Sequence, residues 1–373
     1  MRRWKASLIL VLPIVLGPAL TMAESQDQDP VSQLLRLSEA IKKAKMEARY
    51  EAEQTVYSFT GKDTIVTRFR VQYAYPFRKR ECIEGPENSR FVMLEDGKYQ
   101  WSYFPARKIV VKEPLRDEDS PFPLRPSEDL PSLVKNYQFQ ILGPVPTEGM
   151  HCRIVSFIPR LGDRPRREWW LEERWNIPVR VNVSSSDGRP AYIKQLRRIR
   201  WNAELEPDTF RLRVPKDTRV YEIREQENLT LDEARRLLKH PVVLPRMIPV
   251  GYRPHDIVLR TEGSKKCLQI IYTDGLSSFS YFQEWSSPGV EKSQAPSQFP
   301  PAGTSAVPLA RQLGLMNVVT LPGTDRRAII VGDLQKERLI EMAESIRAAI
   351  RESLGESLKE SFHPESPQEA PQP

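Results

Sequence analysis

Residues 64–75 read TIVTRFRVQYAY, and this stretch decides the fold class of the chain. Phe69, Val71 and Tyr73 fall on every second position, and the residues between them are arginine and glutamine. Because successive side chains of a β-strand point to opposite faces, this alternation predicts a strand with one apolar and one polar face. We therefore expect a half-buried strand of an antiparallel sheet.

Similar alternating runs continue through the first half of the chain. Asp-Gly pairs at residues 96–97 and 187–188 fall between strand-like runs, as tight hairpin turns require. Residues 31–48 and 127–137 have instead the apolar spacing of helices. The alternating positions are Tyr99, Trp101 and Tyr103, then Val179, Val181 and Val183, and finally Phe210, Leu212 and Val214.

Two domains are the natural division of a chain of 373 residues, because this length exceeds the usual span of a single core. The 33 prolines favour short connections and β architecture over long helices. We predict an α+β first domain over residues 24–218, in which a long antiparallel sheet carries a few helices on one face. A smaller α+β domain is expected over residues 219–352.

The second domain begins with a short helix that Thr230 caps, with Glu233 three residues later as in a capping box. An Asp-Gly pair at residues 274–275 joins two of its expected strands. Residues 286–306 are rich in Ser, Pro, Gly and Gln and predict a mobile loop, and the polar tail 353–373 is expected to be disordered. The expected strands are 256–260, 268–273, 276–285, 315–321 and 326–331, and a helix is expected at 334–353.

The amino end carries a localisation signal. Three basic residues among the first five precede an apolar run at residues 6–20, and small residues lead up to Ala23. This pattern predicts a signal peptide over residues 1–23, cleaved after Ala23, and a mature protein exported to the periplasm. A retained membrane anchor is the alternative, but the apolar run is short for crossing a bilayer.

The charge balance narrows the expected partners. Removing residues 1–23 takes away three positive charges and no acidic residue, so the net charge falls from +7 to +4. A mildly basic protein suits phosphorylated lipid headgroups or an acidic protein partner. No helix-based DNA-reading motif occurs, so nucleic acid is not an expected partner. With 39% hydrophobic and 28% charged residues, the chain is expected to be peripheral to a membrane at most.

The sequence offers no recognisable catalytic or metal-binding constellation. Nucleophile elbows, zinc-binding helices, phosphate-binding loops and dinucleotide fingerprints are all missing from it, so we expect neither an enzyme nor a cofactor. Cys82, Cys152 and Cys267 have no zinc or redox spacing. A disulfide between Cys82 and Cys152 is conceivable in an oxidising compartment, and three unpaired thiols are the alternative.

Several segments give the chain a resemblance to a known family. Residues 97–105 read GKYQWSYFP and are followed by KIVV at 108–111. Further on, residues 272–282 read YTDGLSSFSYF, and AIIVGDL at 328–334 leads into MAESI at 342–346. These segments resemble the RseB/MucB regulators of envelope-stress sigma factors, in order and across nearly the whole mature chain.

The resemblance implies a first domain similar to the lipoprotein-carrier fold, a curved antiparallel half-barrel whose concave apolar face is covered by helices and holds acyl chains. Aromatic residues on the inner face of such a sheet would form an apolar cavity, and an ordinary packed core is the alternative for the same residues. The chain departs from the family pattern in a longer tail, in its cysteines and in the extra charges of residues 164–167. The candidate ligand-binding residues are Phe69, Val71, Tyr73, Tyr99, Trp101 and Tyr103.

The resemblance also implies that the second domain contacts a membrane-anchored anti-sigma factor and shields it from regulated proteolysis. Its strand at 276–285 carries aromatic residues on both faces, so it must be covered twice. The final helix, the other domain or a partner segment can supply the second cover, and the resemblance favours a partner. The candidate partner-binding residues are Tyr272, Phe279, Tyr281 and Phe282.

The leading functional hypothesis is therefore a periplasmic regulator of an envelope-stress sigma factor. It would bind the periplasmic domain of an anti-sigma factor and sense lipid or lipoprotein through acyl chains in its cavity. A lipid or lipoprotein carrier without a sigma-factor partner is the alternative. The second domain favours the regulator, because simple carriers of this fold lack such a domain.

Overall fold

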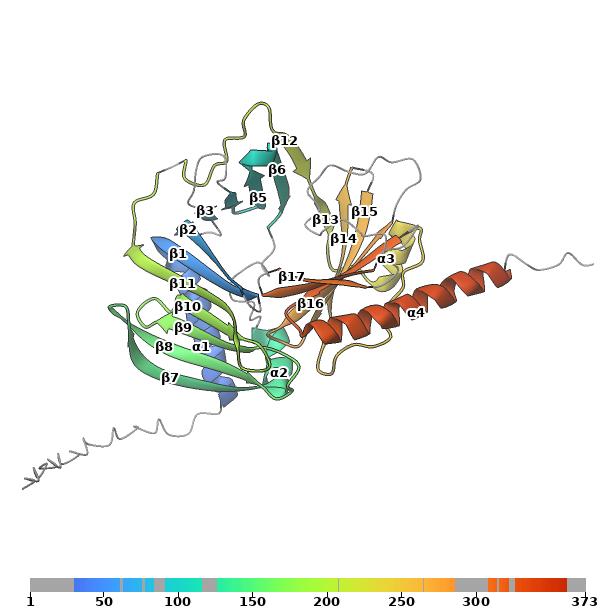
Figure 1. The fold of residues 1–373 in the computed structure, drawn as a ribbon. Helices are drawn as coiled ribbons and strands as arrows, with labels where there is room; N and C mark the ends of the chain where they lie inside the picture. The colour runs from blue at the N-terminus through green and yellow to red at the C-terminus, as the bar shows by residue number, and fades with distance from the viewer. Residues whose placement is uncertain are drawn as a thin grey trace, which may run out of the picture.

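The computed structural model consists of two β-sheets with helices packed against them (Figure 1). The chain is therefore mixed α+β and mostly strand, as predicted. The structure describes residues 30–360 except 61–62, 76–77, 84–90, 116–125, 207, 264, 286–307, 314 and 322–325.

The first sheet has twelve strands in the order β12-β6-β5-β4-β3-β2-β1-β11-β10-β9-β8-β7. Neighbouring strands are antiparallel, except that β12 runs parallel to β6. The strands are β1 (Arg49–Thr60), β2 (Asp63–Ala74), β3 (Arg78–Ile83), β4 (Val92–Asp96), β5 (Tyr99–Phe104), β6 (Ile109–Pro114), β7 (Tyr137–Thr147), β8 (Met150–Pro159), β9 (Arg166–Glu172), β10 (Pro178–Ser184), β11 (Pro190–Trp201) and β12 (Arg219–Glu222). A short 3-10 turn, η2 (Pro105–Arg107), precedes β6.

Two helices pack on one face of this sheet. Figure 1 shows α1 (Pro30–Glu47) running across the curved strands β7–β11, with α2 (Pro126–Asn136) at the end nearest the second sheet. The helical spacing seen in the sequence is the reason, because it places the apolar residues of α1 on one side. The buried residues of that side are Leu34, Leu37, Ile41 and Ala44.

The second sheet has seven antiparallel strands in the order β13-β14-β15-β16-β19-β18-β17. Thr230 caps α3 (Leu231–Leu238) in a capping box with Glu233, as predicted. The long helix α4 (Lys336–Glu360) packs on β18 and β19 and covers one face of the sheet (Figure 1). The strands are β13 (Arg224–Gln226), β14 (Arg253–Glu262), β15 (Lys265–Thr273), β16 (Ser278–Trp285), β17 (Leu309–Leu313), β18 (Met316–Leu321) and β19 (Arg326–Gly332).

Several elements differ from the sequence-based expectation, among them β13, which was not an expected strand. The alternating residues Phe210, Leu212 and Val214 form no strand. They belong to an irregular segment that lies on the first sheet, where Arg80 of β3 donates a hydrogen bond to the Thr209 carbonyl at 3.1 Å. An extended segment on a sheet alternates in burial just as a strand does, so the alternation alone misled the prediction. Strand β17 was not predicted, and α4 continues to Glu360, so the expectation of disorder from residue 353 was wrong for 353–360.

The chain passes from the first sheet to the second at Ile223, between β12 and β13. This crossover lies just after the boundary at residue 218, and the division into two domains there stays a prediction. The predicted signal peptide 1–23, the loop 286–306 and the tail beyond residue 360 lie outside the described residues.

Candidate functional site

Phe69, Val71 and Tyr73 of β2 lie together on the face that α1 covers. Val71 is buried in a cluster with Ala44 and Ala48 at the end of α1, and the other two pack partly buried against the same cluster. The Tyr73 hydroxyl donates a hydrogen bond to the Lys45 carbonyl at 3.0 Å, and burial raises the pKa of Tyr73 to about 12. The predicted half-buried strand is confirmed, and α1 closes over its apolar face.

Tyr99, Trp101 and Tyr103 lie on the opposite face of the sheet. The strand register pairs Tyr73 with Lys79, Lys79 with Glu95, and Glu95 with Gln100. Residues that pair directly across antiparallel strands point to the same side, so Gln100 shares the face of Tyr73 and its neighbour Trp101 does not.

The six candidate residues therefore do not line one cavity. Alternation within a strand shows which residues share a face, but only the register of β3 and β4 decides how the faces of β2 and β5 correspond. Trp101 instead donates a hydrogen bond to Asp96 at 2.8 Å, and the Lys112 ammonium lies 4.0 Å from the centre of the Tyr99 ring.

On the face that carries Val71 and Tyr73, the neighbouring strands β3 and β4 carry charged side chains. Lys79 pairs with Glu95 at 3.0 Å, and Gln54 donates a hydrogen bond to Glu81 at 3.2 Å. Lys194 of β11 lies on this face as well, between Val56 and Val181 in the register. Burial lowers the pKa of Lys194, and the Glu81 carboxylate opposes that shift. The covered face is thus apolar under α1 and charged beside it.

A cavity of about 610 Å³ lies over β1, β2, β11 and the turn between β7 and β8. Phe69 is the one candidate residue among its lining residues, and most of the others are charged or polar. The lining residues are Glu53, Gln54, Thr55, Arg68, Phe69, Glu148, Arg197 and Arg198.

The four candidate partner-binding residues are all at most 5% exposed. Tyr272, Phe279 and Tyr281 belong to the core that α3 and α4 cover, and the rings of Tyr272 and Phe279 stack with centroids 4.7 Å apart. Phe282 packs on the other face with Val318 and Ile329. The final helix thus covers one face, as the alternative reading held, and these four side chains offer no open surface to a partner.

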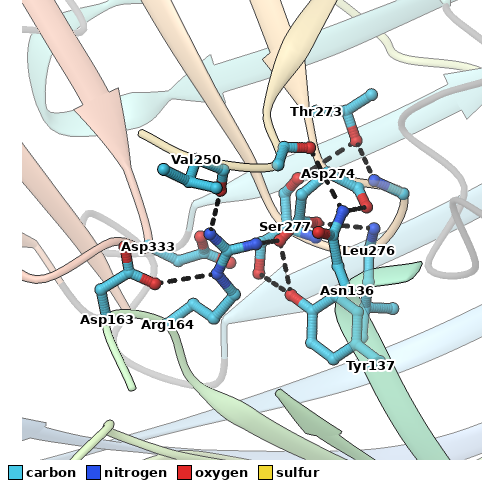
Figure 2. A network of polar contacts seen from close by, with 12 residues as sticks. Asn136, Tyr137, Asp163, Arg164, Val250, Thr273, Asp274, Leu276, Ser277 and Asp333 are labelled. Atoms are coloured by element: carbon cyan, nitrogen blue, oxygen red, sulfur yellow. Dashed lines mark hydrogen bonds and ion pairs between the residues drawn. The ribbon is translucent and has the colours of Figure 1, made fainter. Parts of the chain in front are cut away.

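A buried polar network joins the two sheets, and little in the sequence indicates it. The Asp274 carboxylate accepts hydrogen bonds from Tyr137 and Arg164, both at 2.8 Å, and Asn136 donates one to the Asp274 carbonyl at 2.8 Å (Figure 2). Arg164 and Asp274 are both fully buried. We call Asn136, Tyr137, Arg164 and Asp274 the domain latch. Its signals in the sequence were the unusual charges of residues 164–167 and an Asp-Gly pair interpreted only as a turn.

Other groups of the described chain show no further site. Cys82, Cys152 and Cys267 are free thiols, so the structure contains no Cys82–Cys152 disulfide. Within the described residues, no three His, Cys, Asp or Glu side chains are grouped to hold a metal ion. Among the described helices, none is both long and apolar enough to cross a membrane.

Comparison with known proteins shows which proteins this chain resembles. A family model described as the MucB/RseB N-terminal domain matches residues 37–213, which begin within α1 and include every strand of the first sheet except β12. This part of the chain belongs to the MucB/RseB family. No curated protein sequence matches it.

Solved MucB structures match the fold of this chain over both sheets. The crystal structure of MucB in complex with MucA(peri) is 15% identical, with a TM-score of 0.50, and the match covers 84% of this chain and 96% of that one. The MucA/MucB complex of Pseudomonas aeruginosa is also 15% identical, with a TM-score of 0.49 and coverage of 80% and 93%. MucB without MucA is 14% identical, with a TM-score of 0.49 and coverage of 85% and 97%. At this identity the likeness concerns the fold.

Proposed function

We propose that this MucB/RseB-family protein regulates an envelope-stress sigma factor by binding the periplasmic domain of a membrane-anchored anti-sigma factor. The observation that carries the proposal is the match over both sheets to MucB crystallised with MucA(peri). The presence of a second sheet favours this function over that of a carrier without a sigma-factor partner. The mature protein would act in the periplasm after cleavage following Ala23.

The buried aromatic residues of β16 are not the proposed partner surface, because partner binding there would require the core of the second sheet to open. We propose that the partner binds the outside of the second domain. Protease protection tests this function: the mature chain should slow cleavage of the anti-sigma factor's periplasmic domain. Cleavage at the same rate with and without the folded chain would overturn the proposal.

We further propose that acyl chains bind between α1 and the face formed by Phe69, Val71 and Tyr73. This face is apolar and is covered by one helix, which a ligand could displace. Its charged neighbours, Lys79 and Glu81 among them, would lie beside a polar headgroup rather than along an acyl chain.

A matched pair of variants tests the location of the acyl site. Phe69→Gln places an amide on the proposed wall and should weaken binding of a fluorescent fatty acid, whereas Trp101→Gln on the opposite face should leave it unchanged. Circular dichroism must first show that both variants are folded. Equal loss in both variants, or no loss in either, would remove the site from this face.

A further inference from the structure

The hairpin turn between β15 and β16 is built as a rigid unit. One Asp274 carboxylate oxygen accepts hydrogen bonds from the backbone N–H groups of Leu276 and Ser277, at 3.0 and 2.8 Å. Thr273 adds two more, because its hydroxyl accepts from the Gly275 N–H and donates to the Ser277 carbonyl. Gly275 has a φ of +101°, which favours glycine. The turn therefore presents Asp274 and Leu276 in fixed positions.

Among the described residues, the partners of the second Asp274 oxygen both belong to the first domain. It accepts from the Tyr137 hydroxyl at the start of β7 and from Arg164 in the loop before β9. Arg164 also donates to the Val250 carbonyl at 2.6 Å, so it holds two segments of the second domain (Figure 2). Removing one partner of a fully buried ion pair is strongly destabilising, because the remaining charge stays buried without that partner.

Leu276 is buried in the hydrophobic core of the first domain. It belongs to one cluster with Leu34, Leu37 and Ile41 of α1 and with Leu133 of α2. The second domain therefore supplies part of the core that holds α1 in place. Further along the same helix, Ala44 belongs to the cluster that contains Val71. Helix α1 thus contributes residues both to the cluster that contains Leu276 and to the candidate acyl-binding face.

A second contact reinforces the first. Arg167 of β9 forms an ion pair with Asp333, just before α4, and donates to the Ser277 hydroxyl at 3.4 Å. The turn between β15 and β16 and the residue that follows β19 are therefore both bound to Arg164, in the loop before β9, or to Arg167 of β9. Two of the charges at residues 164–167, Arg164 and Arg167, thus serve the contact between the domains, whereas Arg166 pairs with Glu168 of its own strand.

We propose that the Asp274–Ser277 turn couples the two domains through α1, so that loosening of α1 loosens the second domain and the reverse. Energetic coupling between two sites is reciprocal, so each domain must respond to a change in the other. For ligands, this inference rests on the proposed acyl site, because a chain that enters under α1 would displace the helix on which Leu276 packs.

Hydrogen exchange of the full mature chain tests the coupling without any ligand. Leu276→Ala, a change in the second domain, should speed exchange in α1 by about tenfold or more, because the cavity it leaves destabilises the cluster around Leu34. Leu34→Ala should likewise speed exchange across residues 273–285. Leu276→Val is the milder variant, with a smaller change in the same direction, should Leu276→Ala fail to fold. Asp187→Asn, in an exposed Asp-Gly turn, is the matched control and should alter neither region.

Unchanged exchange of α1 in folded Leu276→Ala and Leu276→Val variants would overturn the coupling. A second measurement separates this outcome from failure of the acyl site. Oleate added to the wild-type chain should speed exchange in both α1 and residues 273–285. A change in α1 alone would contradict the coupling, whereas no change in either region would contradict the acyl site and leave the coupling to the variant data.

Discussion

Two Asp-Gly hairpin turns of this chain have the same local sequence signal and very different surroundings. At residues 187–188, Asp187 accepts hydrogen bonds from Arg189 and Ser185 of its own turn, and its side chain is 46% exposed. At residues 274–275, Asp274 also stabilises its own turn but is fully buried against Arg164 and Tyr137. The dipeptide specifies a turn in both places, and the topology decides which turn joins the domains.

The largest expected effect comes from removing the buried charge at the second turn. Asp274→Asn removes the fully buried carboxylate beside Arg164 and leaves Asp163 as its one ion-pair partner among the described residues, which should lower the free energy of unfolding by about 3–5 kcal/mol. Urea unfolding monitored by tryptophan fluorescence measures it. Asp187→Asn is the control, because an ion pair between solvent-exposed side chains contributes little to stability. Losses of equal size at the two turns would contradict the contrast between them.

Leu276→Ala should cost nearly as much, about 2–5 kcal/mol, since it leaves a cavity in the core beneath α1. The exposed turn has no counterpart of this side chain. Calorimetry of the full chain provides the measurement, with a lower transition temperature as the expected result. A transition temperature equal to that of the wild type would mean that Leu276 contributes nothing to that core.

Two glycines extend the comparison to the backbone, one beside Asn136 and one in the exposed turn. Gly251 and Gly188 have similar positive φ values, +88° and +84°, so alanine is strained at both. At Gly251 an added Cβ would also lie 2.3 Å from the Asn136 side-chain oxygen, whereas at Gly188 nothing lies within 4 Å.

Gly251→Ala should therefore destabilise the chain by about 1–3 kcal/mol, and more than Gly188→Ala does. The difference would report disruption of the domain latch, because Asn136 bonds to both Gly251 and Asp274. Unfolding curves of the two variants, recorded side by side, provide the test. Equal destabilisation would show that Asn136 adjusts without cost.

The smallest expected effect is the acid dependence of the exposed turn. Hydrogen bonds from Arg189 and Ser185 hold the pKa of Asp187 well below its usual range. A carboxyl whose pKa is lower in the folded state stabilises the fold above its unfolded pKa of about 3.9 and loses that contribution as the pH falls through its folded pKa. The small stability difference between wild type and Asp187→Asn should be present at pH 7 and shrink below about pH 4. A difference that is constant across this range would contradict the assignment.

Features that depend on neighbouring residues could be predicted from the sequence. The alternation around Val71, the capping box of Thr230 and Glu233, and the Asp-Gly turns all appear in the structure because their causes lie within a few residues. The family resemblance, noted from short segments taken in order, is supported by the family model that matches residues 37–213.

Features that depend on register or on distant contacts could not be predicted. Trp101 and Tyr73 each sit in an alternating strand, but two intervening strands decide that they face opposite sides. The burial of Arg164 could not be predicted either. A charged residue in a loop is normally solvated, and the partner of Arg164 lies 110 positions further along the chain. Tyr272 and Phe279 were correctly judged to need cover, and the structure supplies it from the same domain.

Direct binding of the partner tests the central claim of the proposed function. The measurement is a calorimetric titration of the periplasmic domain of the cognate anti-sigma factor into the folded, mature full-length chain. The account predicts saturable binding, with the same affinity for wild type and for the Asp187→Asn variant of the exposed turn. Absence of binding by the folded wild-type chain would contradict the assignment of this protein as an anti-sigma-factor regulator.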